Sequence, residues 1–370
     1  MSRVVSPTLY FFIACFSFVL GSTTGCTKTD PTPGLPGAGQ TPVTTIKAGA
    51  REVNLAIWAN YLSPETAARF TKQTGIRLNV SNYSSNEELL AKIQAGAAGL
   101  DVAVPSEYMV VVLKKLDLLQ QIDAAQVPNK SGLDPKFMNQ AFDPKNELSI
   151  PYSWTSVGLA VNRDLYKGKL TSYKELLTNA DLAGKFSMLD DVREVTSAAL
   201  KAQGHSVNTT DPEQLKKAKE MLQAARPRIK MFTSDTIDPL VNKEIAVAQT
   251  FSSDALQAAR RSKTKIEFII PDEGGTRALD SLVVLKSSKN SKEAMELINF
   301  LISPEANLEF VQKNMGGPVV TATKAALPKD LSTSQTLYPS DATLKKLEPI
   351  EDVGEGTRLY DRLWTELKTE

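Results

Sequence analysis

The sequence is poor in the residues that metal centres and many catalytic sites use. Its 370 residues contain one histidine, His205, and two cysteines, Cys15 and Cys26. A zinc site built from cysteine and histidine needs three or four such ligands, so this chain cannot form one. A histidine-based catalytic triad has a single candidate histidine, and two cysteines do not make a disulfide framework. The chemistry that remains is a carboxylate site, an aromatic site or no catalysis.

An excess of charge is missing as well. Lys and Arg number 43 against 42 Asp and Glu, which gives a net charge of +1. Nucleic-acid binders usually carry a basic excess, so we expect no nucleic-acid partner. The chain shows neither a phosphate-binding glycine loop nor a nucleophile motif, and we therefore expect no cofactor and no enzymatic activity. The enzymatic alternative is an acid–base pair made by the neighbouring carboxyls Asp190 and Asp191.

The chain also lacks a long hydrophobic run. Arg3 precedes an apolar stretch at residues 9–20, and small residues follow at 21–25. This stretch is too short to span a bilayer comfortably and is typical of a secretory signal peptide, here residues 1–25. Cys26 then resembles the lipidated cysteine of a bacterial lipoprotein. We expect an exported protein in the periplasm or on the outer cell surface, bound to the membrane only through Cys26. The alternative is plain secretion.

Residues 26–51 are rich in Pro, Gly and Thr and have little apolar surface to bury. Such a segment is expected to be a flexible tether. The remaining 320 or so residues would form the folded part, and the total length fits two domains.

The body of the chain alternates strand and helix patterns. Strands are expected at 53–58, 76–80 and 100–105, with helices after Ser63 and from 86 to 95. This order predicts a parallel sheet with helices on both faces. Further strands are expected at 158–161, 186–189, 244–249, 266–271 and 282–285. Further helices are expected at 215–225, opened by residues 210–213, at 291–301 and from Pro304. We expect an α/β protein of two lobes that share crossing strands.

Several short motifs appear in a characteristic order. They are Trp-Ala-Asn-Tyr at 58–61, Pro-Ser-Glu-Tyr at 105–108, Ile-Pro-Tyr-Ser-Trp at 150–154, Asp-Asp-Val-Arg-Glu-Val at 190–195, Glu-Gly-Gly at 273–275, Asp-Ser-Leu at 280–282 and Asn-Phe-Leu at 299–301. Together they resemble the spermidine/putrescine-binding proteins of bacterial polyamine importers, over residues 52–370.

The resemblance implies a two-lobed type II periplasmic solute-binding protein fold with a ligand cleft between the lobes. Lobe 1 would comprise residues 52–155 and 279–324, and lobe 2 residues 156–278 and 325–370. The chain would cross between lobes near residues 156, 278 and 324. The lobes would close on the ligand by hinge bending.

The resemblance also implies the ligand-binding residues. The rings would come from Trp58, Tyr61 and Tyr108, a hydroxyl from Ser106, and carboxylates from Asp191, Glu194 and Asp280. An ammonium group removed from water needs a carboxylate or another acceptor, and it also gains from an aromatic face. Other roles are open for these residues. The rings could be core packing, Asp191 and Glu194 could form salt bridges with Arg193, and Asp280 could cap a turn or helix.

Some positions depart from the family pattern. This chain has Ala278 where the family pattern has Trp, Gly317 where it has Tyr, Ile350 where it has Gln and Ala59 where it has Thr. Phe251 replaces a Trp and keeps an aromatic ring. Asp254 adds an acid. Arg277 adds a cation that would either repel an amine or neutralise Asp254. The ligand is therefore expected to be a polyamine or related cation bound with altered preference, such as a longer or bulkier amine.

The resemblance implies ABC permease and ATPase subunits as partners, and we expect a monomer. Two alternatives remain open. The same fold could bind another small solute, or the protein could be a polyamine sensor that signals to a membrane receptor.

Overall fold

The computed structural model describes residues 51–96 and 99–369. The expected signal peptide, the lipid anchor Cys26 and nearly all of the expected tether lie outside these residues. No helix within them has both the length and the apolar character needed to cross a bilayer.

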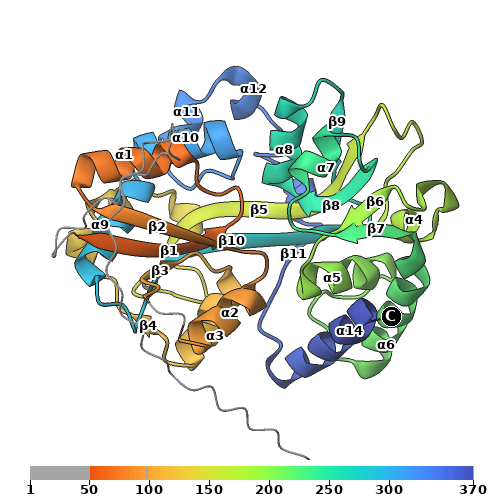
Figure 1. Ribbon diagram of the computed structural model, residues 1–370, viewed down its shortest axis with the longest axis horizontal. Coiled ribbons are helices and arrows are strands. Elements are labelled where there is room, and N and C mark those ends of the chain that lie inside the picture. Colours follow the sequence, from red (N-terminus) through yellow and green to blue (C-terminus); the bar gives the residue numbers. More distant parts are fainter. Residues whose placement is uncertain (1–50, 97–98, 370) are drawn as a thin grey trace, which may run out of the picture. The chain divides into compact units, whose positions relative to one another are not determined.

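Strands and helices alternate along the chain, as the α/β pattern predicts (Figure 1). The strands are β1 (Glu52–Trp58), β2 (Arg77–Tyr83), β3 (Val102–Ala103), β4 (Leu119–Gln120), β5 (Ser149–Asn162), β6 (Phe186–Met188), β7 (Ile229–Phe232), β8 (Val247–Phe251), β9 (Ile266–Ile269), β10 (Gly275–Leu285) and β11 (Leu347–Pro349). The helices are α1 (Pro64–Thr74), α2 (Asn86–Gln94), α3 (Glu107–Lys115), α4 (Tyr173–Thr178), α5 (Val192–Ala202), α6 (Pro212–Ala225), α7 (Ile237–Val241), α8 (Ser252–Arg261), α9 (Ser291–Leu301), α10 (Pro304–Asn314), α11 (Thr323–Ala326), α12 (Lys329–Ser332), α13 (Asp341–Leu344) and α14 (Thr357–Thr369).

Local sequence sets the helix ends that the pattern predicts. Ser63 accepts a hydrogen bond from the backbone N–H of Thr66 at 3.1 Å, and Pro64 follows it as the first residue of α1. Such a start satisfies a backbone donor that the helix itself leaves free. Gly75 ends α1 with φ +72°, a conformation that glycine adopts without steric cost.

The sheet is mixed, so the expectation of a parallel sheet holds at both ends, where β6 also pairs in parallel with β7 and β8, and is wrong in the middle. The order is β2-β1-β3-β10-β5-β8-β6-β7. The strand β1 pairs in parallel with β2 and β3, but β10 is antiparallel to both β3 and β5. The antiparallel pair arises because β5 carries the chain from the first half of the fold to the second, and β10 carries it back.

The pair β5 and β10 forms the middle of the sheet and runs from one half of the fold to the other (Figure 1). Sequence patterns predicted only residues 158–161 and 282–285 of these strands. The structure extends them to 14 and 11 residues. Gly275 is the first residue of β10. The pairing register shifts between Asp280 and Ser281, which is an irregularity of the β-bulge kind.

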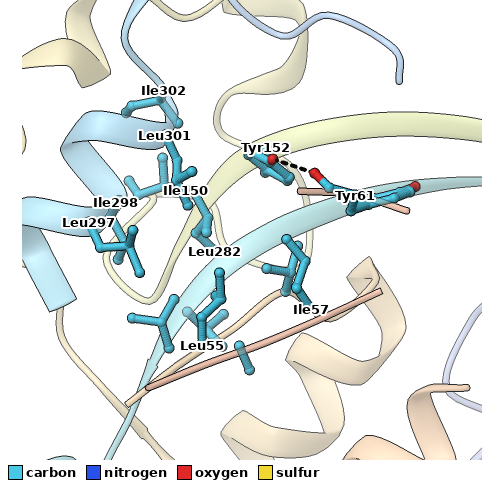
Figure 2. Packing of buried hydrophobic residues seen from close by; sticks show 14 of the residues in the cluster. Leu55, Ile57, Tyr61, Ile150, Tyr152, Leu282, Leu297, Ile298, Leu301 and Ile302 are labelled. Carbon is cyan, nitrogen blue, oxygen red and sulfur yellow. Dashed lines mark hydrogen bonds between the residues drawn. The ribbon is translucent and has the colours of Figure 1, made fainter. Parts of the chain in front are cut away.

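Each half has its own hydrophobic core. Core 1 joins β1, β3, α3, α9 and parts of β5 and β10. Figure 2 shows Leu297, Ile298 and Leu301 of α9 packed near Ile150 of β5 and Leu282 of β10. Core 2 joins β6, α4, α5, α6 and α14 with the second half of β5, and a smaller cluster lies under α7 and α8. Burial of each such side chain contributes roughly 1.5–3 kcal/mol.

Candidate ligand-binding site

A pocket lies where residues of the two halves meet. The space in it that the centre of a water-sized sphere can occupy is about 30 Å³, and the void that also counts its opening to solvent is about 640 Å³. All nine side chains that the sequence proposed for ligand binding line this pocket: Trp58, Tyr61, Ser106, Tyr108, Asp191, Glu194, Phe251, Asp254 and Asp280. They come from the end of β1, the start of α3, the start of α5, the β8–α8 junction and β10. His205 does not line it.

Asp280 lies inside β10, beside the register shift, and is 2% exposed. Its Oδ2 accepts a hydrogen bond from the Tyr61 hydroxyl at 2.9 Å, and its Oδ1 accepts one from Ser106 Oγ at 2.7 Å. Burial raises the pKa of this carboxyl to about 7, although the two hydroxyl donors act to lower it. The alternative role of Asp280 as a turn or helix cap is wrong, because its side chain is bound by residues distant in sequence.

Asp191 begins α5 and is buried. Its Oδ1 accepts hydrogen bonds from the backbone N–H groups of Arg193 at 2.9 Å and Glu194 at 3.0 Å, so this carboxylate caps the helix. Burial, together with the charge of Glu87, raises its pKa to about 7. One oxygen thus fixes the side chain, and the carboxyl group still lines the pocket.

Glu194 lies in the first turn of α5. Its Oε2 accepts a hydrogen bond from Thr276 Oγ1 of β10 at 2.6 Å. Burial and the neighbouring charge of Asp191 raise the pKa of Glu194 to about 8. The two acids at the start of α5 are therefore buried together. A negative charge on one of them makes a negative charge on a neighbouring carboxyl less favourable.

The expected alternative of salt bridges to Arg193 is not what the structure shows. The guanidinium of Arg193 donates to the backbone oxygen of Glu351 at 3.0 Å and to Asn208 Oδ1 at 3.0 Å. It also lies 5.5 Å from the ring centre of Tyr108 and 4.6 Å from that of Tyr360. Its charge reaches the acids of α5 only through space.

Asp254 lies in the first turn of α8 and is buried in the pocket wall. Burial and then the charge of Asp235 raise its pKa to about 8. The one side-chain donor near it among the described residues is Ser253 Oγ, at the long distance of 3.5 Å. Asp254 is therefore the least satisfied of the four buried acids.

The aromatic side chains serve both the core and the pocket. Trp58 donates its indole N–H to the backbone oxygen of Val104 at 2.9 Å and packs on Tyr83 at 4.7 Å between ring centres. It also faces Phe251 of the other half edge-on at 6.0 Å. Tyr108 donates its hydroxyl to Glu87 Oε1 at 2.9 Å. Core packing was the alternative role for these rings. The structure shows that they pack in the core and also line the pocket.

Tyr61 stands against core 1 and turns its hydroxyl toward Asp280. Its backbone oxygen accepts a hydrogen bond from the hydroxyl of Tyr152 at 3.1 Å, drawn as a dashed line in Figure 2. Its ring also meets Phe310 edge-on at 5.7 Å. Tyr61 is thereby fixed from two sides.

The departures from the family pattern fall in different places. Ala59, Ala278 and Ile350 line the pocket, but Gly317 does not. The backbone of Gly317 pairs with Trp154, and a Cβ at residue 317 would lie 2.3 Å from the Trp154 backbone oxygen. A tyrosine therefore cannot replace this glycine unless the backbone moves.

Sequence reasoning missed further pocket residues, which are Tyr83, Asn86, Glu107, Thr155 and Ser234. Asn86 donates to Ser106 Oγ at 3.1 Å and accepts from the Ser106 backbone N–H at 3.1 Å, so it positions a hydroxyl that binds Asp280. Glu107 lies between Ser106 and Tyr108, two proposed ligand-binding residues of the 105–108 motif. This position was the one sequence signal that could have placed Glu107 at the pocket.

The pocket is strongly acidic. Its lining includes five carboxyl groups, counting Glu107, against the single cation Arg277. Within the described part of the chain, no Lys or Arg side-chain nitrogen lies within 4.0 Å of a carboxylate oxygen of Asp191, Glu194, Asp254 or Asp280. Buried carboxylates without a cationic partner are costly, so such a site favours either protons or a bound cation. No group of three or more metal-ligating residues is found among residues 51–96 and 99–369.

Comparison with known proteins agrees with this geometry. Residues 65–340 match the model of the bacterial extracellular solute-binding protein family. The spermidine/putrescine-binding periplasmic protein of Salmonella typhimurium is 35% identical over 315 residues, which is 84% of this chain and 90% of that protein.

Solved structures give the same result. A putative spermidine/putrescine ABC transporter protein from Listeria monocytogenes has a TM-score of 0.81 at 30% identity, and the match covers 86% of this chain and 99% of that one. The TpPotD lipoprotein of Treponema pallidum has a TM-score of 0.74 at 28% identity over 86% and 100% of the two chains. The expected two-lobed fold is confirmed, and this chain belongs to the bacterial extracellular solute-binding protein family, among the relatives of the spermidine/putrescine-binding periplasmic proteins.

Proposed function

We propose that the protein captures a polyamine or a related small cation in this pocket and delivers it to an ABC importer. The observation that carries the proposal is the group of four buried carboxyls, Asp191, Glu194, Asp254 and Asp280, none of which forms an ion pair with a Lys or Arg side chain among the described residues. An ammonium group would supply the missing positive charge. Relatives named for binding spermidine and putrescine support the proposal.

The aromatic rings and the carboxylates would bind different parts of the ligand. Ammonium groups would bind at the carboxylates, and the methylene stem would lie between Trp58, Tyr61, Tyr108 and Phe251. An ammonium near a ring face gains roughly 0.5–2 kcal/mol. Asp254 adds an acid to the set that the family resemblance implies. It is the natural place for an ammonium, because it lacks a close hydrogen-bond donor of its own.

The proposed lobes follow the two cores, with hinges in β5 and β10. Lobe 1 holds residues 52–155 and 279–324, and lobe 2 holds 156–278. Leu327 and Leu337 pack in core 1, whereas β11 pairs with residues 275–277 and Glu348 binds Lys201, which supports a third crossing between residues 338 and 347 in place of residue 324. Hinge bending at these crossings would open the pocket and let the ligand enter.

We propose that residues 1–25 are removed as a signal peptide, that Cys26 carries a lipid and that residues 26–51 are a tether. The support is the sequence pattern and the presence of a lipoprotein among the similar structures. The protein would work as an exported monomer, without a cofactor, with ABC permease and ATPase subunits as partners.

Native mass spectrometry of protein purified without refolding tests the proposed function. The expected result is a co-purifying mass of a small polyamine that leaves on mild activation. A matched pair of variants sharpens the experiment. Asp254→Asn is expected to lose the adduct, whereas Asp238→Asn, a change at a half-exposed surface acid paired with Arg261, is expected to keep it. An adduct of an anion or a sugar would contradict the proposal.

A further inference from the structure

We propose that Arg277 sets the preferred length of the ligand, because its guanidinium competes with an outer ammonium group for the carboxylate of Glu107. This inference rests on the proposed function and adds a selectivity to it. Arg277 would disfavour long polyamines, and the site would prefer short ones.

Arg277 is the one basic residue among the described residues that line the pocket. It lies in β10 between Thr276, which binds Glu194, and Ala278, which lines the pocket. Its side chain is 42% exposed, whereas the four acids deeper in the site are buried. The guanidinium is therefore at the rim, and it can move without disturbing the packed core.

Glu107 is the partner of Arg277, and it is only partly satisfied. Its Oε2 accepts a hydrogen bond from the backbone N–H of Leu279 at 2.7 Å, and its side chain is 15% exposed. Its Oε1 lies 3.9 Å from Arg277 Nη1, which is too far for a hydrogen bond. Arg277 therefore pairs with Glu107 and not with Asp254, the partner considered from the sequence. The pair is held only by charge attraction.

The placement of this pair gives the selectivity. Both ammonium groups of a short diamine can pair with the inner carboxylates, so the pair of Arg277 and Glu107 is not disturbed. A longer polyamine has further ammonium groups, and one that reaches the rim must either displace the guanidinium from Glu107 or lie beside it. Like charges that lie side by side repel each other, and at a rim that is partly exposed water and salt weaken this repulsion without removing it. Arg277 would thus limit the length of the ligand.

Calorimetric titration with putrescine, spermidine and spermine tests this inference on three proteins. These are the wild type, Arg277→Gln and the control Arg358→Gln, which removes the same charge from an 84% exposed position on α14. Arg277→Gln is expected to raise the affinity for spermine about ten-fold relative to putrescine. Arg358→Gln is expected to leave the ratio unchanged. Arg277→Ala should repeat the result with a shorter side chain.

A second substitution tests the mechanism. In the double variant Arg277→Gln with Glu107→Gln, the gain for spermine is expected to disappear, while the amide oxygen can still accept from Leu279. The outcomes separate the two proposals. A wild type that binds none of the three amines overturns the proposed function and this inference with it. A wild type that binds them, with equal changes or none for all three in Arg277→Gln, overturns this inference alone.

Discussion

Two hydroxyl groups and no positive charge hold the carboxylate of Asp280. Tyr61 and Ser106 each donate to one of its oxygens, and Asn86 in turn fixes Ser106. Neutral donors also hold the carboxylate of Asp191, which uses one oxygen to cap α5. The residues are therefore positioned before any ligand arrives, which lowers the ordering cost of binding.

Asp280→Asn is expected to lower the affinity for a polyamine at least ten-fold, because an ammonium would lose its charged partner. The unliganded variant is expected to melt no lower than the wild type at pH 8, since the substitution removes a buried charge. Calorimetry and thermal unfolding measure the two effects, with Asp238→Asn as the surface control. An unchanged affinity would remove Asp280 from the site.

The buried acids also predict a dependence on pH. Burial raises the pKa of Asp191 and Asp280 to about 7 and that of Glu194 and Asp254 to about 8, from ordinary values near 4. Between about pH 4 and the raised pKa values of about 7 and 8, these carboxyls stay protonated in the folded protein but lose their protons in the unfolded chain. By linkage, the contribution of these groups to the free energy of unfolding falls as pH rises from about 4 to about 8.

A bound cation reverses this effect because it replaces the protons. The melting shift caused by a polyamine is therefore expected to be larger at pH 8.5 than at pH 6, and binding near pH 7 is expected to release protons. Thermal unfolding at both pH values, and calorimetry in buffers of different ionisation enthalpy, measure this. The Asp254→Asn variant should show a weaker dependence. A melting shift that shrinks with rising pH would contradict the prediction.

At the scale of single elements, the long strands β5 and β10 were the hardest to predict. The middle of β5 contains Pro151, Ser153, Thr155 and Ser156, and such a polar stretch is typical of a loop. In the structure these residues are buried, and Thr155 shares a hydrogen bond with Ser252 at 3.1 Å. Tertiary contacts near the pocket satisfy them, and local sequence patterns do not contain that information.

Helices with clear start and stop residues were predicted closely. The helix expected at 215–225, opened by residues 210–213, agrees with α6, the range 291–301 agrees with α9, and the helix after Ser63 agrees with α1. In each case the apolar spacing fixes the buried face, and capping or terminal residues fix the ends of α1 and α6. The mixed direction of the sheet could not be predicted, because strand pairing depends on contacts distant in sequence.

The turn at Gly316 and Gly317 belongs to this scale as well. A Cβ at residue 317 would lie 2.3 Å from the Trp154 backbone oxygen, so Gly317→Ala is expected to destabilise the protein by about 1–3 kcal/mol. The matched control is Gly132→Ala in the 3-10 turn Pro128–Gly132, where a Cβ meets nothing within 4 Å. Urea unfolding compares them. Equal stability of the two variants would contradict the close approach.

At the scale of the whole molecule, two hydrophobic cores meet at an acidic pocket. All nine side chains that the sequence singled out line this pocket, although they come from segments up to 222 residues apart, from Trp58 to Asp280. The family resemblance made this possible, because composition and periodicity carry no such long-range information. Tyr83, Asn86 and Ser234 were missed, since each belongs to a segment without a recognised motif.

The central claim is that the pocket binds a polyamine, and titration calorimetry with putrescine, spermidine and spermine at pH 8 tests it most directly. We predict saturable binding of one ligand per chain by at least one of the three, with a matching rise in melting temperature and a loss in Asp280→Asn. The absence of both heat and a melting shift with all three would contradict the account.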